Sequence, residues 1–130
     1  MTKVQRFVRA AGAFYIFLGV IGLFGALGGT ASSTPNDLLG VLEVTVISNI
    51  IHLGVGAALW AATQTQATAR TVSTFVGVVF LLIGILEVAS IGSVADLIGS
   101  SVAGSVLHLT TAALALYFGR LHPSPVDGTV

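Results

Sequence analysis

The stretch that decides the fold runs Thr45-Val-Ile-Ser-Asn49-Ile-Ile-His52-Leu53, and it has a counterpart in Ser101-Val-Ala-Gly-Ser105-Val-Leu-His108-Leu109. Each stretch opens on a hydroxyl residue and reaches a histidine inside an otherwise apolar segment. The chain of 130 residues is 55% hydrophobic and 8% charged, whereas a soluble domain carries about 25% charged residues. Because so little charge remains to coat a water-facing surface, both stretches are expected to lie within a membrane.

Four apolar segments are long enough to cross a bilayer. A helix needs about 17 to 25 such residues, and lipid offers no hydrogen-bond partner to an unpaired backbone group. The sequence therefore predicts an all-α integral membrane four-helix bundle, with one domain over residues 1–121 and a cytoplasmic tail at 122–130. The predicted spans are 8–27, 46–62, 72–89 and 102–118.

The charges predict how the bundle is oriented. With four spans, all five basic residues fall on one side of the membrane: Lys3, Arg6, Arg9, Arg70 and Arg120. Four acids lie at or near the connections on the other side, namely Asp37, Glu43, Glu87 and Asp96. The positive-inside rule then puts both termini in the cytoplasm. A cleaved signal peptide is the alternative for the first segment, but the apolar core of a signal peptide is only about 7 to 15 residues.

Matching motifs recur in the two halves of the chain. Gly12-Ala-Phe-Tyr-Ile-Phe-Leu-Gly19 pairs with Gly77-Val-Val-Phe-Leu-Leu-Ile-Gly84, and Asp37-Leu-Leu-Gly40 pairs with Asp96-Leu-Ile-Gly99. Because each half has two spans, both halves enter from the same side, which predicts a parallel 2+2 repeat about an axis along the membrane normal. The segment from Leu38 to Val44 is expected to form an interfacial helix or a partly re-entrant loop.

Thr45 and Ser101 are expected to be the N-caps of the second and fourth helices, because a hydroxyl oxygen can accept an N–H of the first turn. Both histidines then lie at one depth, about 10 Å below the outer helix ends at about 1.5 Å per residue. Small or polar residues share their helix faces. The predicted intramembrane polar site or packing seam is Ser48, Asn49, His52, Ser101, Ser105 and His108.

Two interpretations of this site remain open. Polar residues at such positions commonly join helices by hydrogen bonds, so the histidines could be the seam between the two halves. Alternatively they could ligate haem or a transition metal, or handle a proton or small solute. Glu43 and Glu87 are the acids that could approach from the outer face, although Glu87 is also close enough to a helix end to reach the headgroups. We expect no cofactor, with haem or a metal on His52 and His108 as the alternative.

The stretch from Leu38 to Gly56 resembles the signature of a family of small four-helix bacterial membrane proteins, domain of unknown function 4383. That family typically has His-Asn-x-x-His-Leu in the second helix and Leu-His in the fourth, as in Leu107-His108 here. Ser48 stands where the family usually has its first histidine, and Gly104-Ser105 stand where an Asn or Asp is common. The resemblance implies a multi-pass protein of the bacterial cytoplasmic (plasma) membrane, and it implies no activity.

No hydrolase, metalloprotease or phosphate-loop motif occurs in the sequence, so we do not expect an enzyme. The formal net charge is +0, which argues against nucleic-acid binding. Stripes of small residues such as Gly54-x-x-x-Ala58 favour close helix contacts. The predicted role is a structural or accessory subunit that packs against itself or other membrane proteins in the lipid bilayer. The alternative is a small-solute, proton or metal/haem-handling protein centred on His52 and His108.

Overall fold

The computed structural model describes residues 1–28, 36–38, 42–89 and 101–121, and the side chains of 1–24, 45–89 and 101–120. Within these ranges it contains 4 helices that are long and apolar enough to span a membrane. The predicted all-α membrane bundle is therefore confirmed. The helices are α1 (Lys3–Gly28), α2 (Val46–Ala61), α3 (Gln66–Val88) and α5 (Val102–Leu116).

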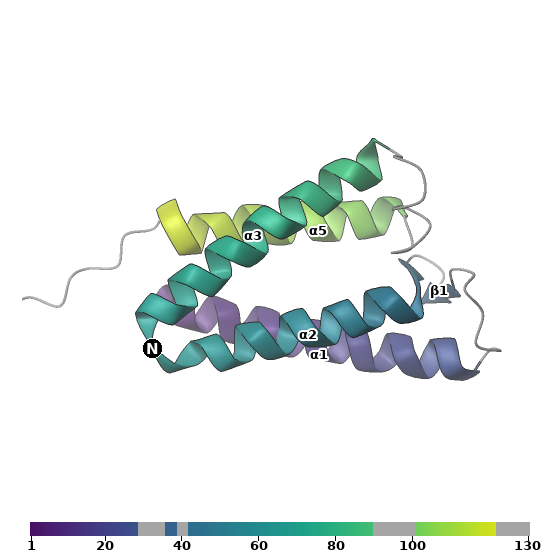
Figure 1. The fold of residues 1–130 in the computed structure, drawn as a ribbon, viewed down its shortest axis with the longest axis horizontal. Coiled ribbons are helices and arrows are strands. Elements are labelled where there is room, and N and C mark those ends of the chain that lie inside the picture. The colour runs from purple at the N-terminus through teal and green to yellow at the C-terminus, as the bar shows by residue number, and fades with distance from the viewer. Residues whose placement is uncertain (29–35, 39–41, 90–100, 122–130) are drawn as a thin grey trace, which may run out of the picture.

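The helices pack as two antiparallel hairpins (Figure 1), which are referred to below as the first hairpin, α1 with α2, and the second hairpin, α3 with α5. A short 3-10 turn, η1 (Ala62–Gln64), leads from α2 into α3, and a π-helical turn, η2 (Tyr117–Leu121), continues α5. Gln5 Nε2 donates to the carbonyl of Thr63, and Arg70 Nε donates to the carbonyl of Gly119. These bonds gather the start of α1, the α2–α3 connection and the end of α5 at one end of the bundle, the basic end.

Helix starts follow side-chain caps. The Thr45 hydroxyl accepts from Ser48 N, and the Ser101 hydroxyl accepts from Gly104 N, so both predicted N-caps are confirmed. Thr65 caps α3 in the same way, so α3 begins before the predicted boundary at residue 72. Likewise α1 begins at Lys3 rather than at residue 8. The predicted boundaries followed apolarity, whereas a helix starts where its first N–H groups find an acceptor.

The described residues of the segment from Leu38 to Val44 are strands, so the interfacial-helix alternative is wrong for them, and residues 39–41 of the segment lie outside the described residues. Strands β1 (Asn36–Leu38) and β2 (Leu42–Val44) pair antiparallel, with Asp37 opposite Glu43. A helix of so few residues cannot recover the cost of nucleation, whereas paired strands satisfy backbone groups at once. β2 also lies against α5, so this pair of strands reaches from the first hairpin to the second.

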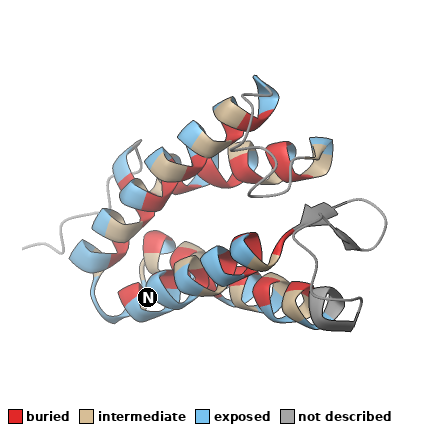
Figure 2. Ribbon diagram, turned by 45° about the vertical axis from the view of Figure 1, so that its right-hand side comes forward, coloured by how far each residue is buried: buried red, intermediate tan, exposed pale blue. Residues whose placement is uncertain are grey.

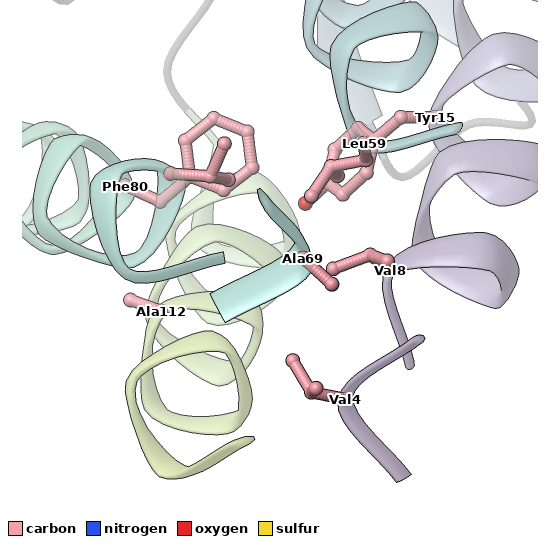
Figure 3. Packing of buried hydrophobic residues seen from close by; sticks show 8 residues of the cluster. Val4, Val8, Tyr15, Leu59, Ala69, Phe80 and Ala112 are labelled. Carbon is pink, nitrogen blue, oxygen red and sulfur yellow. The ribbon is translucent and has the colours of Figure 1, made fainter. Parts of the chain in front are cut away.

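The buried faces of the helices turn toward one another, and the exposed faces point outward (Figure 2). Figure 3 shows the apolar core at the meeting of the hairpins, where the ring centroids of Tyr15 and Phe80 are 5.1 Å apart. Large apolar side chains such as Phe17 and Phe75 cover the outer faces, with 60% and 68% of their surfaces exposed. An outer surface of this kind suits lipid, which needs no polar coat.

Glycines set how closely the helices of each hairpin approach. A Cβ on Gly56 would lie 2.6 Å from Ile16 N and 2.9 Å from the Gly12 carbonyl, so α1 and α2 touch backbone to backbone. In the second hairpin a Cβ on Gly84 would instead meet the side chain of Leu109. Close contacts of this kind maximise van der Waals packing, which drives helix association in lipid.

Candidate intramembrane polar site

His52 from α2 and His108 from α5 face each other between the two hairpins. Their ring centroids are 5.9 Å apart, and only 7% and 8% of the two residues remain exposed. Each histidine is placed by the helix whose N-cap stands two turns earlier, Thr45 or Ser101. The two sequence-predicted histidines thus belong to one site.

Glu87 of α3 lies beside His108, within the second hairpin. Both Glu87 carboxyl oxygens are 2.9 Å from His108 Nδ1, and Glu87 is 3% exposed. The carboxyl group therefore faces inward, and the expectation that it reaches the headgroups is wrong. An ionisable side chain within a membrane is costly unless it has a partner, and the imidazole next to Glu87 provides one.

His52 lacks such a partner among the described residues. Its Nδ1 is buried and makes no hydrogen bond there. A cavity of about 20 Å³ lies against it, lined by Ser48, Ile51, His52, Phe80, Ile83 and His108. Since about 10 to 15 Å³ of such volume holds one water molecule, this cavity, which both histidines line, has room for a single water.

Asn49 lies in α2, three residues before His52, and belongs to the first hairpin. It is 0% exposed, and neither its Nδ2 nor its Oδ1 finds a partner in the described part of the chain. The amide lies over Gly22 of α1, where any Cβ would collide with it. Among the described residues Asn49 is therefore held by packing against Gly22 and makes no hydrogen bond to the histidine pair.

The remaining predicted site residues serve mainly as caps. Ser48 Oγ accepts from Thr45 N and donates to the Thr45 carbonyl, which closes a capping box. Ser105 Oγ donates to the Ser101 carbonyl. The backbone of Glu43 lies in β2, and its side chain is outside the described part of the structure. The Ser48 hydroxyl therefore stabilises the start of α2 and also borders the small cavity, whereas the Ser105 hydroxyl is satisfied within its own helix.

Three residues that were absent from the predicted site border it. The Tyr15 hydroxyl and Thr111 Oγ1 are 2.8 Å apart, which joins α1 to α5. The Tyr15 ring lies 5.4 Å from His52, and the Phe80 ring lies 5.0 Å from His108, measured between centroids. Tyr15 and Phe80 hold matching places in the two glycine-flanked motifs, so the sequence contained a signal for both.

A groove leads along the second hairpin to the carboxyl group. It has a volume of about 420 Å³ and is lined by Glu87, Val88, Ser101, Val102, Ser105, Val106 and Leu109. The site thus combines a carboxyl–imidazole pair, a second imidazole with an unpartnered nitrogen, and a space for one water. Within the described residues no group of ≥ 3 His, Cys, Asp or Glu side chains is arranged to hold a metal. This donor set is suited to protons.

Nearly the whole chain matches a known protein family. The model of the family described as Domain of unknown function (DUF4383) matches residues 5–121, which covers α1 from its third residue, the other three helices and every described residue of the site. The chain belongs to the DUF4383 family. The family description states no activity, so the polar centre of this DUF4383 protein has to be interpreted from its own geometry. No curated protein and no solved structure matches the chain.

Proposed function

We propose that this small polytopic membrane protein binds a proton at Glu87, His108 and His52, and that its function depends on this proton. The supporting observation is the buried contact between His108 Nδ1 and the Glu87 carboxyl oxygens, at 2.9 Å. An unneutralised carboxylate in this position is strongly disfavoured. One proton neutralises the pair, either on the carboxyl group or as an imidazolium beside a carboxylate.

His52 is the second proton acceptor in this proposal. Among the described residues, the titratable groups that face the Glu87–His108 pair from the first hairpin are His52 and Tyr15, whose rings are 5.4 Å apart. A water in the small cavity that both histidines line would carry a proton from one imidazole to the other. A cavity of about 20 Å³ suits a water better than an organic solute, which supports the proton among the predicted alternatives.

Infrared titration of the purified protein in lipid nanodiscs tests the proposal. We expect a protonated-carboxyl band that responds to pH, disappears in Glu87→Gln and shifts in His108→Gln. The matched control is His122→Gln, which removes a histidine of the tail and should leave the band unchanged. A band that is the same in the native protein and in Glu87→Gln would contradict the proposal.

As a second candidate function we propose the structural or accessory role that the sequence predicts. It is supported by the small share of the described chain that lies outside the four candidate spans, which leaves little surface for a soluble partner. Gentle extraction should then recover the protein with a second copy or with another membrane protein. A monomer that extracts without any partner would argue against this role.

The orientation and the internal repeat are also proposals. The basic end is inferred to face the cytoplasm of a bacterium, because all five Lys and Arg residues lie there. Equivalent contacts support the repeat, since Gly19 meets Leu53 in the first hairpin and Gly84 meets Leu109 in the second. The chain has no cysteine, so Gln64→Cys and Asp37→Cys can be labelled in intact cells with an impermeant maleimide. Labelling of Gln64→Cys would refute the orientation.

A further inference from the structure

A groove at the basic end of the second hairpin is separate from the proton site. It has a volume of about 650 Å³ and is lined by Arg70, Thr71, Thr74, Phe75, Val78, Gly119 and Arg120. One wall is the first part of α3, and the other is the π-helical turn η2. Neither the charge pair nor the histidines contribute to it, so it needs a different explanation.

The fold builds this groove from specific contacts. Arg70 Nε donates to the Gly119 carbonyl at 3.2 Å, and Thr74 Oγ1 donates to the Arg70 carbonyl at 2.8 Å. A Cβ at Gly119 would lie 2.9 Å from Thr74 N, so only glycine lets η2 approach α3 this closely. The bond through Nε fixes the Arg70 guanidinium at the groove while its terminal nitrogens keep their own N–H groups for a ligand.

Polarity changes along the groove in the direction of the membrane normal. Arg70, Thr71 and Arg120 lie at the end of the bundle, where Arg120 is exposed. Phe75 and Val78 follow along α3 toward the bilayer centre, with 68% and 45% of their surfaces exposed. From Arg70 to Val78 the helix rises about 12 Å. The groove is therefore cationic at the headgroup level and apolar at the level of the acyl chains.

From this arrangement we infer that the groove binds one anionic glycerophospholipid, with its phosphate at Arg70 and Arg120 and an acyl chain along Phe75 and Val78. Among the described residues two guanidinium groups and no acid line the groove, and a guanidinium suits the geometry of a phosphate. Basic pockets between transmembrane helices are known to recognise anionic headgroups. The inference does not depend on the proposed proton site.

Native mass spectrometry of the detergent-solubilised protein tests this inference with phosphatidylglycerol and phosphatidylcholine as probes. We expect one phosphatidylglycerol to bind at least about tenfold more tightly than phosphatidylcholine, which corresponds to about one good charge-assisted contact. Arg70→Gln with Arg120→Gln should abolish that preference. Lys3→Gln with Arg6→Gln is the matched control, because it removes the same charge at the same end but outside the groove, and it should keep the preference.

Two further measurements separate the groove from general attraction between charges. Val78→Trp fills the apolar half and keeps both arginines, so it should weaken phosphatidylglycerol binding. Arg120→Gln alone leaves the Arg70–Gly119 bond intact, which covers the case in which the double variant does not fold. Equal binding of both lipids, equal loss in the Lys3/Arg6 control, or displacement of the lipid by excess inorganic phosphate would each overturn the inference.

Discussion

The two hairpins share a packing frame but differ in what they bury near the ends of the helices opposite the basic end. In the first hairpin Gly22 makes room for Asn49, whose amide has no partner in the described residues. In the second hairpin Glu87 holds His108 through both carboxyl oxygens. Similar backbones therefore carry a neutral group packed by shape in one half and an ionisable pair in the other. The comparison shows that the chemistry of the site is concentrated in the second hairpin.

The largest effect is expected from the two histidines. His108→Leu leaves the Glu87 carboxyl group buried without a partner, and breaking a buried pair in this way costs about 3 to 5 kcal/mol. His52→Leu removes a ring whose Nδ1 has no partner among the described residues, so it should cost about 1 kcal/mol or less. Detergent-induced unfolding followed by Trp60 fluorescence measures both free energies.

A double variant controls the interpretation of that experiment. Glu87→Leu combined with His108→Leu removes both partners and should recover part of the stability lost in His108→Leu alone, since no unpaired polar group remains. If His52→Leu costs as much as His108→Leu, the two hairpins do not differ as the structure indicates.

The next effect comes from the glycines that hold each hairpin together. Gly56→Ala places a methyl group against the backbone of Ile16 and Gly12, which cannot move without separating α1 from α2. Gly84→Ala meets the Leu109 side chain, which can rotate. Overpacking typically costs about 1 to 3 kcal/mol, so Gly56→Ala is expected near the upper value and Gly84→Ala near the lower. The same unfolding experiment compares them, and a reversed order would contradict the packing described.

Local sequence patterns predicted much of this fold. The four spans follow from apolar length, and the caps at Thr45 and Ser101 follow from hydroxyl residues at the helix starts. Each of these features depends on residues that are close in the chain. The common depth of His52 and His108 could be predicted for the same reason, because a cap fixes the depth of a side chain two turns later.

The direction of Glu87 could not be predicted in this way. Its contact with His108 depends on how far α3 is rotated and shifted against α5, and that is set by tertiary contacts such as Gly84 against Leu109. From the sequence alone, a carboxyl group near a helix end can equally well extend to the headgroups. The Tyr15–Thr111 bond joins the two hairpins, so it too depends on an arrangement that no local pattern specifies.

Substitution of Asn49 in the first hairpin is expected to have a smaller effect on stability, and to raise it rather than lower it. An unsatisfied buried polar group costs about 1 to 3 kcal/mol, and leucine removes that cost, although its larger volume against Gly22 offsets part of the gain. Asn49→Leu should therefore stabilise the protein by about 1 kcal/mol, as measured by detergent-induced unfolding. Ser105→Ala is the counterpart in the second hairpin and should change stability little, because the Ser101 carbonyl keeps its bond from Ser105 N. A clear loss of stability in Asn49→Leu would mean that the amide has a partner.

The smallest effect is expected at the start of α2. Ser48 and Thr45 form a reciprocal capping box at the start of α2. At the start of α5 the place of Ser48 is taken by Gly104, which has no side chain to return a bond to Ser101. Ser48→Ala should therefore cost about 0.5 to 1 kcal/mol and speed hydrogen exchange at the Thr45 amide, which Ser48 Oγ accepts at 2.8 Å. Gly104→Ala loses no cap, and alanine favours a helix by up to about 1 kcal/mol over glycine, so it should not destabilise α5. If the Thr45 amide exchanges at the same rate in Ser48→Ala, the reciprocal bond does not protect it, and the two helix starts are equivalent after all.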